Sequence, residues 1–187
     1  MRHGEILLPD ERKRYIGQSD CPMTEDGKRQ VERKLAAMKK EFPILAGICS
    51  SDLLRCVQTA KAAARCYDMS FEKDKRLREI HMGSWEGLLI DAVRERYPED
   101  YEERGKDPGI FCPPGGESFQ MVADRVWEAL AFWGRTFGQE APLLVITHAG
   151  VIKTMKCKAQ REELNQVFRY RIGYGEYMTM EYPADFH

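Results

Sequence analysis

The run L-L-V-I-T-H-A-G at residues 143–150 decides the fold of this chain. Its first five residues are apolar or β-branched at nearly every position, which is typical of a parallel strand covered on both faces. Residues 151–158 then read as a helix. His148 follows the strand directly, and Ala149 and Gly150 are small enough to let a ligand approach the backbone.

Strands and helices alternate along the rest of the chain. The pattern predicts strands or extended pieces over residues 47–50, 70–73 and 174–182, and helices over residues 24–42, 53–67, 88–97, 118–137 and 161–168. Such alternation predicts an α/β fold, a three-layer sandwich whose mostly parallel central sheet is flanked by helices.

Several residues mark the ends of these elements. Thr24 is expected to cap the first helix, and Ser51 with Asp52 is expected to cap the second. Pro98 is expected to end the helix over residues 88–97. Glycine and proline cluster over residues 105–116, which predicts a loop rather than a domain boundary.

Length and composition favour one globular domain over residues 1–187. The 187 residues include 29 Lys+Arg and 30 Asp+Glu, a net charge of -1, and 43% are hydrophobic. This balance argues against disorder and against a polyanion-binding surface. No apolar stretch reaches the roughly 18 residues of a membrane span, and no signal-peptide core begins the chain. We therefore expect a cytoplasmic protein without nucleic-acid or membrane partners; the sequence indicates no oligomeric state.

The cysteines and histidines do not predict a metal site. The six cysteines are irregularly spaced with no C-x-x-C pair, so we expect reduced thiols that are mostly buried. His3, His81 and His148 lack the H-E-x-x-H spacing of a zinc enzyme.

Cationic and imidazole side chains gather where strands are predicted to end. Arg55 lies in the first turn of the second helix, His148 follows the strand at 143–147, and Arg2 and His3 open the chain before Gly4. Ligands of open α/β sheets bind at the carboxyl ends of the strands, near helix N-termini that attract anions. Guanidinium groups match phosphate oxygens, so these residues predict a phosphate site.

A phosphate site that breaks esters also needs a proton donor. The segment L-R-E-I-H-M-G-S-W-E-G at residues 77–87 supplies two carboxylates, Glu79 and Glu86. Either one could serve as a general acid above the site. Read singly, Glu86 is more often a surface or cap residue, and His81 could support Glu79 or merely pack.

These pieces together resemble the histidine phosphatase superfamily, which has the phosphoglycerate mutase-like fold. The matching blocks are R-H-G at residues 2–4, S-S-D-L-L-R-C-V-Q-T-A at 50–60, residues 77–87 as quoted, G-G-E-S at 115–118 and T-H-A-G at 147–150. They follow that family's order and roughly its spacing.

The resemblance implies a role for each matching residue. His3 corresponds to the nucleophile that becomes phosphohistidine, and Glu79 to the proton donor. Arg2, Arg55 and His148 correspond to the pocket that neutralises the phosphoryl oxygens. A cationic pocket can stabilise a loose phosphoryl transition state by itself, so the resemblance implies neither a metal nor a cofactor.

The segment R-Y-I-G-Q-S-D-C-P-M-T-E-D-G at residues 14–27 is similar to a run common among α-ribazole-phosphate phosphatases. This similarity favours a phosphatase acting on a small phosphate ester such as α-ribazole 5′-phosphate. The alternatives are a phosphoglycerate mutase-type phosphotransferase and a non-catalytic relative that only binds phosphate esters. Gln18 and Ser19, with Gly4 and Ala149, would then contact the substrate. Trp85 and the 105–116 loop would shape the leaving-group pocket.

The chain departs from the family's pattern in two places. Many members have Ser or Thr two residues after the R-H-G glycine, where this chain has Ile6. The family's apolar first strand is missing, because the sequence begins Met1-Arg2. Losing about four buried side chains at about 1.5–3 kcal/mol each would remove much of a typical stability of about 5–15 kcal/mol. We therefore expect low stability, with a misassigned start codon or a truncation as the explanation and a decayed relative as the alternative.

Overall fold

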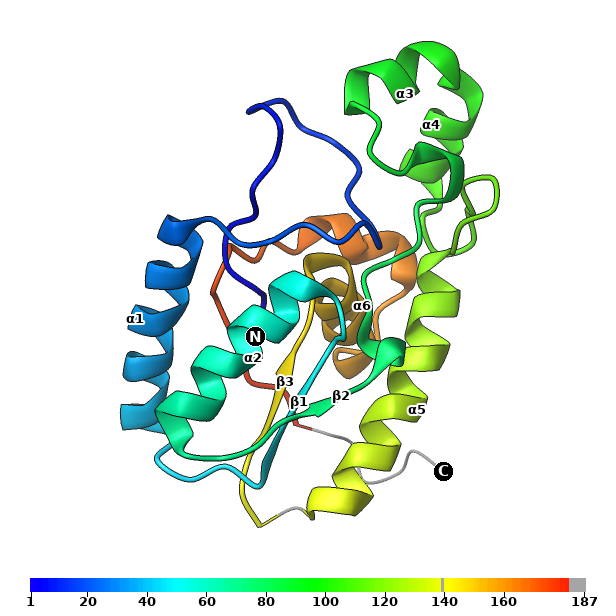
Figure 1. The fold of residues 1–187 in the computed structure, drawn as a ribbon. Helices are drawn as coiled ribbons and strands as arrows, with labels where there is room; N and C mark the ends of the chain where they lie inside the picture. The colour runs from blue at the N-terminus through cyan, green and yellow to red at the C-terminus, as the bar shows by residue number, and fades with distance from the viewer. Residues whose placement is uncertain (139, 182–187) are drawn as a thin grey trace.

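The computed structural model describes residues 1–138 and 140–181, and a short parallel sheet lies at its centre (Figure 1). The sheet has the order β2-β1-β3, formed by β2 (Glu72–Lys73), β1 (Gly47–Ser50) and β3 (Leu143–Ile146). Both pairings are parallel, and Ser50 lies opposite Lys73 on one side and Ile146 on the other. The predicted strands at 47–50 and 143–147 are thereby confirmed, while the predicted 70–73 piece shortens to two residues.

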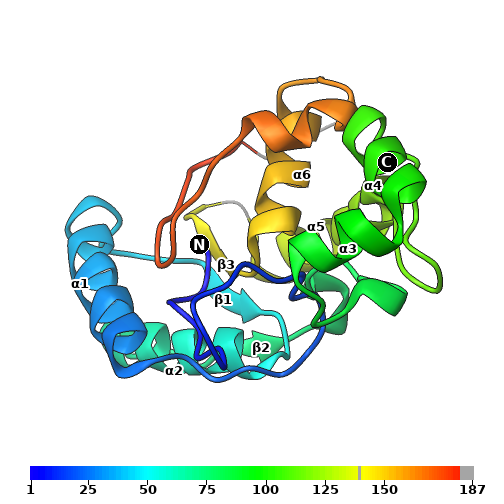
Figure 2. The same ribbon diagram turned by 90° about the horizontal axis from the view of Figure 1, so that it is seen from above.

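Helices cover both faces of this sheet, as Figure 2 shows from above. On one face α1 (Glu25–Glu41) packs against α2 (Leu54–Tyr67), and on the other α5 (Phe119–Phe137) packs against α6 (Ala149–Ala159). Along β3, Leu144 and Ile146 join the apolar core beneath α1 and α2, whereas Leu143 and Val145 face the core beneath α5 and α6. The predicted three-layer sandwich is confirmed.

The first residues of the chain lie alongside β3. The Met1 ammonium group donates to the Val145 carbonyl at 2.7 Å, and the Thr147 N–H donates to the Met1 carbonyl at 2.9 Å. Burial lowers the pKa of this amino group to about 6. In place of a full first strand the structure has a single parallel bridge between Arg2 and Thr147.

The predicted strand at 174–182 is wrong over its described residues, and Tyr182 lies outside them. A turn at Gly175, with φ of +67°, interrupts the extended backbone there. The segment still contacts the chain start, because the Arg2 N–H donates to the Glu176 carbonyl at 2.8 Å and the Gly175 N–H to the His3 carbonyl at 3.0 Å. These two bonds join the segment to the chain start without forming a regular strand.

The region after residue 88 holds a helix that the sequence reading missed. The predicted 88–97 helix is α3 (Ile90–Arg96), and a second helix, α4 (Pro98–Lys106), follows immediately. Proline is well accommodated at the first position of a helix, where its missing N–H is not needed, so Pro98 begins α4 as well as limiting α3. In Figure 1 the α3–α4 pair lies at one end of the molecule, beyond α5.

Of the two predicted helix caps, one is confirmed. Thr24 accepts from the Gly27 N–H, which confirms the cap of α1. The predicted cap of α2 by Ser51 and Asp52 is wrong. The Leu54 N–H donates to the Asp20 carboxylate at 2.5 Å, and Ser51 Oγ accepts at 3.4 Å only from Leu53, the residue before the helix. Asp52 is unavailable because Arg78 binds its carboxylate with two bonds of 2.7 Å.

Three smaller features complete the fold. The predicted 161–168 helix is a 3-10 helix, η3 (Leu164–Arg169), and two short 3-10 turns occur at η1 (Lys75–Leu77) and η2 (Gly83–Trp85). All six thiols are free, and Cys49, Cys56 and Cys157 are buried. No helix within the described ranges has both the length and the apolar character needed to span a bilayer.

Arg125 of α5 ties the segment that carries Glu79 to the helical layer. Its Nη1 donates to the carbonyls of Arg76 and Arg78 at 2.6 and 2.7 Å, and its Nη2 donates to the Glu79 carbonyl at 3.1 Å. Nε and Nη2 also bind the Glu117 carboxylate at 2.8 and 2.9 Å. One guanidinium group therefore fixes the backbone over residues 76–79.

We expect Arg125→Met to lower the free energy of unfolding by about 2–4 kcal/mol, because three carbonyls and a carboxylate lose a partly buried partner. Urea unfolding measures the change. The control is Arg65→Met, since Arg65 only approaches Glu32 at 3.9 Å on an exposed surface, and its expected change is below about 0.5 kcal/mol. Equal losses in the two variants would contradict the structural role of Arg125.

Candidate active site

The predicted site residues meet at the carboxyl ends of β1 and β3. The His3 N–H donates to the Thr147 carbonyl at 3.1 Å, which places His3 next to the residue that follows β3. As a result the rings of His3 and His148 pack edge to face with centroids 5.2 Å apart. Arg55 reaches the same place from the first turn of α2.

His3 is held as a neutral imidazole. It is buried, and its Nδ1 lies 2.8 Å from the Gly4 carbonyl, an acceptor, so Nδ1 carries the proton. Burial lowers the pKa of His3 well below its usual value, and the positive charge of Arg55 lowers it further. Nε2 therefore keeps a free lone pair, which is the state that a nucleophile requires.

The backbone after His3 runs directly against the start of α1. A Cβ atom on Gly4 would lie 2.5 Å from the Gly27 carbonyl oxygen, and a Cβ atom on Gly27 would collide with the Glu5 carbonyl oxygen. The Thr24 N–H also donates to the Glu5 carbonyl at 2.9 Å. The absence of side chains at both glycines thus sets the position of His3 relative to α1.

Arg55 is a buried cation with its charge turned toward backbone dipoles. It is 1% exposed, and its two terminal nitrogens donate to the carbonyls of Ser19 and Gly17 at 2.7 and 2.6 Å. Its Nε donates to His148 Nδ1 at 3.2 Å. These bonds lock the guanidinium group in place and leave further N–H groups for an anion.

Arg2 is held more loosely from the opposite wall. Its Nη1 donates to the Ile172 carbonyl at 2.7 Å, and its guanidinium carbon lies 3.8 Å from the centre of the Tyr174 ring. The buried Nε of Arg2 has no hydrogen-bond partner. An anion bound between Arg2 and Arg55 would supply the acceptor that this nitrogen lacks.

His148 lies behind Arg55 rather than in the cavity wall. It is fully buried, and its Nε2 donates to Ser51 Oγ at 2.9 Å while Nδ1 accepts from Arg55. Burial lowers the pKa of His148 well below its usual value, as does the charge of Arg55. A neutral imidazole adds no positive charge to the site. In the structure His148 positions Arg55 through a hydrogen bond, and direct phosphate binding by His148 stays a prediction.

Glu79 faces the same cavity from the segment after β2. Its Oε2 accepts from the Gly150 N–H at 3.1 Å and its Oε1 from the Ile80 N–H at 3.0 Å. A Cβ atom on Gly150 would collide with Oε1 of this carboxylate. The N-terminus of α6 therefore positions Glu79 only because residue 150 is glycine.

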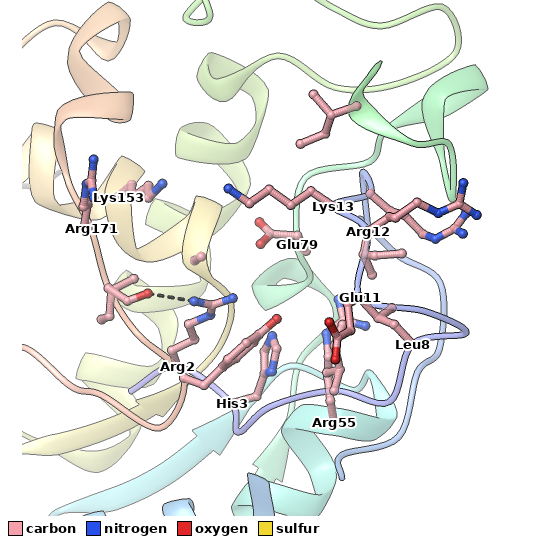
Figure 3. Close-up of a pocket in the computed structure, with 17 residues that line it drawn as sticks. Arg2, His3, Leu8, Glu11, Arg12, Lys13, Arg55, Glu79, Lys153 and Arg171 are labelled. Atoms are coloured by element: carbon pink, nitrogen blue, oxygen red, sulfur yellow. Dashed lines mark hydrogen bonds between the residues drawn. The ribbon is translucent and has the colours of Figure 1, made fainter. Parts of the chain in front are cut away.

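A cavity of ≈ 690 Å³ opens above these groups (Figure 3). Arg2, His3, Arg55, Glu79 and Ala149 line it, as the sequence predicts for a shared site. A neighbouring cavity of ≈ 290 Å³ shares Glu79 with it, together with Arg14, Ile16 and Lys153. The carboxyl group thus stands at the boundary between two hollows.

Other predicted contacts lie outside the cavity wall. The Gly4 carbonyl binds His3, and the Ser19 carbonyl binds Arg55. The Gln18 side-chain amide donates to the Glu79 carbonyl at 3.1 Å. These three residues support the site through the backbone, and substrate contact by their side chains stays a prediction.

The residues predicted to shape the leaving-group pocket, Trp85 and the 105–116 loop, do not line the cavity. Trp85 is fully buried among aromatic rings, with the rings of Tyr15 and Phe111 at 5.3 and 5.5 Å, so it belongs to the core. No residue of the 105–116 loop lines either cavity described here. The wall comes instead from residues 8–16 and from Lys153, Arg171 and Tyr174.

Glu86 contributes a support that sequence reading missed. Its carboxylate accepts from the backbone N–H groups of Gly17, Gln18 and Ser19 at 2.9, 3.2 and 3.2 Å. The same turn offers the two carbonyls that hold Arg55. Because the donors are backbone groups, the only available signal was the closeness of Glu86 to the matching 77–87 block.

No group of three or more His, Cys, Asp and Glu side chains in the described part of the chain could hold a metal ion.

Comparison with known proteins identifies relatives over nearly the whole chain. A family model described as "Histidine phosphatase superfamily (branch 1)" matches residues 1–186. "Phosphoglycerate mutase-like protein 4" of Arabidopsis thaliana is 33% identical over 86% of this chain and 69% of its own length. "Phosphoserine phosphatase 1" of Hydrogenobacter thermophilus is 30% identical over 89% of this chain and 78% of its own length.

A solved structure gives the same result for the fold. "Bacillus stearothermophilus YhfR" superposes with a TM-score of 0.83 at 30% identity, over 93% of this chain and 84% of that one. The chain spans 50% of the length of three mycobacterial proteins that it also matches.

Stability is expected to fall as the pH drops below about 6.5. His3 and His148 have lowered pKa values in the folded chain but return to about 6.5 on unfolding. The unfolded chain then binds more protons, which costs up to about 1.4 kcal/mol per pH unit for each histidine. Urea unfolding should show a smaller pH slope for His148→Gln than for the wild type. His81→Gln removes an exposed histidine and should keep the wild-type slope.

Gly150→Ala is expected to lower kcat/KM for p-nitrophenyl phosphate about tenfold or more, because the new methyl group displaces the Glu79 carboxylate. The matched control is Gly134→Ala within α5, where a Cβ atom meets nothing within 4 Å. That control should keep its activity and gain up to about 1 kcal/mol of stability. Equal activity of both variants would show that Glu79 does not depend on its contact with α6.

Proposed function

This chain belongs to the histidine phosphatase superfamily, branch 1, and is an enzyme of phosphate-ester chemistry; we propose that it hydrolyses small phosphate monoesters without a metal ion. The proposed intermediate is a phosphohistidine on His3. The observation that carries the proposal is the neutral His3, whose Nε2 is free at the floor of a cavity that also contains Arg2, Arg55 and Glu79.

The first step transfers the phosphoryl group to the protein. The lone pair of His3 Nε2 forms a bond to phosphorus while the bond from phosphorus to the ester oxygen breaks. The protonated carboxyl group of Glu79 gives its proton to the departing alkoxide, so the alcohol leaves neutral. Glu79 then remains as a carboxylate stabilised by the Gly150 N–H.

The second step returns the protein to its starting state. A water molecule attacks phosphorus from the side that the alcohol left, and the Glu79 carboxylate accepts its proton. The nitrogen–phosphorus bond breaks, which restores neutral His3 and protonated Glu79. The sum of both steps is one ester plus one water giving one alcohol and one phosphate.

Fixed positive charge supplies the stabilisation of the transition state in this proposal. Arg55 is locked by three hydrogen bonds and Arg2 has an unpartnered Nε, so both present N–H groups without a large rearrangement. The N–H of Ala149, in the first turn of α6, adds a helix N-terminus to the same cavity. His148 would act through Arg55 and by hydrogen bonding.

The alcohol of the proposed substrate is inferred from similarity to known proteins. The similarity of residues 14–27 to α-ribazole-phosphate phosphatases makes α-ribazole 5′-phosphate a substrate to test. Names of relatives point to phosphoserine and phosphoglycerate as well. If a second alcohol replaced water in the second step, the same residues would catalyse phosphotransfer as a mutase does.

His3→Ala is expected to abolish labelled phosphohistidine and to lower kcat for p-nitrophenyl phosphate at least about 10³-fold, since the nucleophile is lost. Glu79→Gln should lower kcat by about 10²–10⁴-fold while phosphate esters still bind. Phosphate release is measured with EDTA present, and the labelled protein is trapped by an alkaline quench.

His81→Ala is the control for both substitutions, because His81 is exposed and lines neither cavity. It should keep activity within about twofold. Wild-type activity in His3→Ala, or complete loss of activity in EDTA, would refute the proposed mechanism. Binding of esters without phosphate release would identify the non-catalytic alternative.

A further inference from the structure

The segment that follows η3 carries a turn that lies against the nucleophile. In Figures 1 and 2 this segment, coloured orange to red, runs beside the first residues of the chain. The Gly175 N–H donates to the His3 carbonyl at 3.0 Å, and the Arg2 N–H donates to the Glu176 carbonyl at 2.8 Å. Main-chain bonds therefore fix this turn relative to the backbone of Arg2 and His3.

The turn is also closed by bonds of its own. The Gly173 N–H donates to the Glu176 carboxylate at 2.7 Å, and the Glu176 N–H donates to the Gly173 carbonyl at 3.3 Å. Between them Gly175 has a φ of +67°, a value that favours glycine. Tyr174 precedes Gly175 in this turn, and its side chain lines the large cavity. The position of Tyr174 is thus set by local backbone geometry.

The ring of Tyr174 contacts two residues of the proposed phosphate site. The guanidinium carbon of Arg2 lies 3.8 Å from the ring centre, which is a cation–π contact. The ring of His3 lies 5.7 Å away, measured between centroids, at an interplanar angle of 47°. One aromatic side chain therefore touches both a phosphate-binding cation and the nucleophile.

The two arginines of the site are held in different ways. Three hydrogen bonds lock Arg55. The guanidinium group of Arg2 is held by the Ile172 carbonyl at 2.7 Å and by the face of the Tyr174 ring. A long arginine side chain has many rotamers, so the loss of either contact would let Arg2 leave the cavity wall.

An aromatic face is a suitable partner for a cation that must bind phosphate. A carboxylate would occupy the N–H groups of the guanidinium and offset its charge. A ring face attracts the cation but accepts no strong hydrogen bond, so the charge and the N–H groups stay available. The unpartnered Nε of Arg2 agrees with this arrangement.

We propose that Tyr174 is a positioning residue for phosphoryl transfer, because the face of its ring holds the Arg2 guanidinium group at the phosphate site without neutralising it. This inference rests on the proposed function and adds to it a residue outside the sequence blocks that predict the site. The ring is the part that acts, and the hydroxyl group is dispensable. A cation held in place before substrate binds stabilises the charge of the transition state without reorganisation.

Substitutions at Tyr174 separate the ring from the hydroxyl group. Tyr174→Phe keeps the ring and should keep kcat/KM for p-nitrophenyl phosphate within about twofold. Tyr174→Leu and Tyr174→Met remove it and should each lower kcat/KM about fivefold to twentyfold. Methionine fills more of the space of the ring, so one of these two variants keeps the test open if the other does not fold.

Tyr177→Leu is the matched control from the same segment. The Tyr177 ring packs against Phe42 at 6.4 Å, its hydroxyl group donates to Glu41 at 2.6 Å, and it lines neither cavity. This variant also loses a partly exposed aromatic ring. It should nevertheless keep kcat/KM within about twofold.

A double-mutant cycle shows whether Tyr174 acts through Arg2. Arg2→Met alone should lower kcat/KM strongly, because a phosphate-binding cation is lost. In the Arg2→Met chain, the further change Tyr174→Leu should lower kcat/KM less than about twofold. Full additivity of the two losses would overturn the proposal, as would wild-type activity in Tyr174→Leu and Tyr174→Met or an equal loss in Tyr174→Phe.

Binding of inorganic phosphate repeats the cycle without turnover. Calorimetry should show about threefold or more weaker binding to Tyr174→Leu than to the wild type, wild-type affinity in Tyr174→Phe, and no further loss in the Arg2→Met chain. Phosphate binding that follows this pattern without hydrolysis of p-nitrophenyl phosphate would contradict the proposed function and support the role of Tyr174. Hydrolysis by a wild type whose activity and phosphate affinity survive Tyr174→Leu would do the reverse.

Discussion

The buried guanidinium group of Arg55 is the constraint on which the site depends. A cation that is 1% exposed must be surrounded by hydrogen-bond acceptors, and here they are the carbonyls of Gly17 and Ser19 and the imidazole of His148. The Glu86 carboxylate fixes the turn at residues 17–19 that offers these carbonyls. Burial lowers the pKa values of His3 and His148, and the charge of Arg55 lowers them further, so the same buried cation acts on both the loop and the nucleophile.

Much of the fold could be predicted because local patterns and tertiary packing agree. The apolar run at 143–147 is buried between two helical layers, and Thr24 caps the helix that its sequence suggests. Secondary structure was predicted wrongly where tertiary packing or turn geometry outweighed the local sequence pattern. The aromatic and β-branched residues after 174 suggest a strand, but the turn at Gly175 breaks it. Pro98 ends one helix pattern and also begins α4.

The site was predictable only in part, for a physical reason. Arg2, His3, Arg55 and Glu79 follow strand ends or match ordered blocks, and the fold brings them to one cavity. Their supports are mostly backbone groups, which carry no residue signature. Likewise, Lys153 and Arg171 are ordinary surface cations until the topology places α6 and the segment after η3 on one wall.

The close approach of Gly4 and Gly27 has a consequence for how this protein can evolve. A Cβ atom on Gly4 would collide with the Gly27 carbonyl oxygen, and a Cβ atom on Gly27 would collide with the Glu5 backbone, so the two positions are coupled through main-chain atoms of the same contact. A change at either one can be accommodated only if α1 moves away from the backbone beside His3. Substitution of a side chain elsewhere cannot restore that separation. The effects of substitutions at Gly4 and Gly27 are therefore coupled, although the two residues make no side-chain contact.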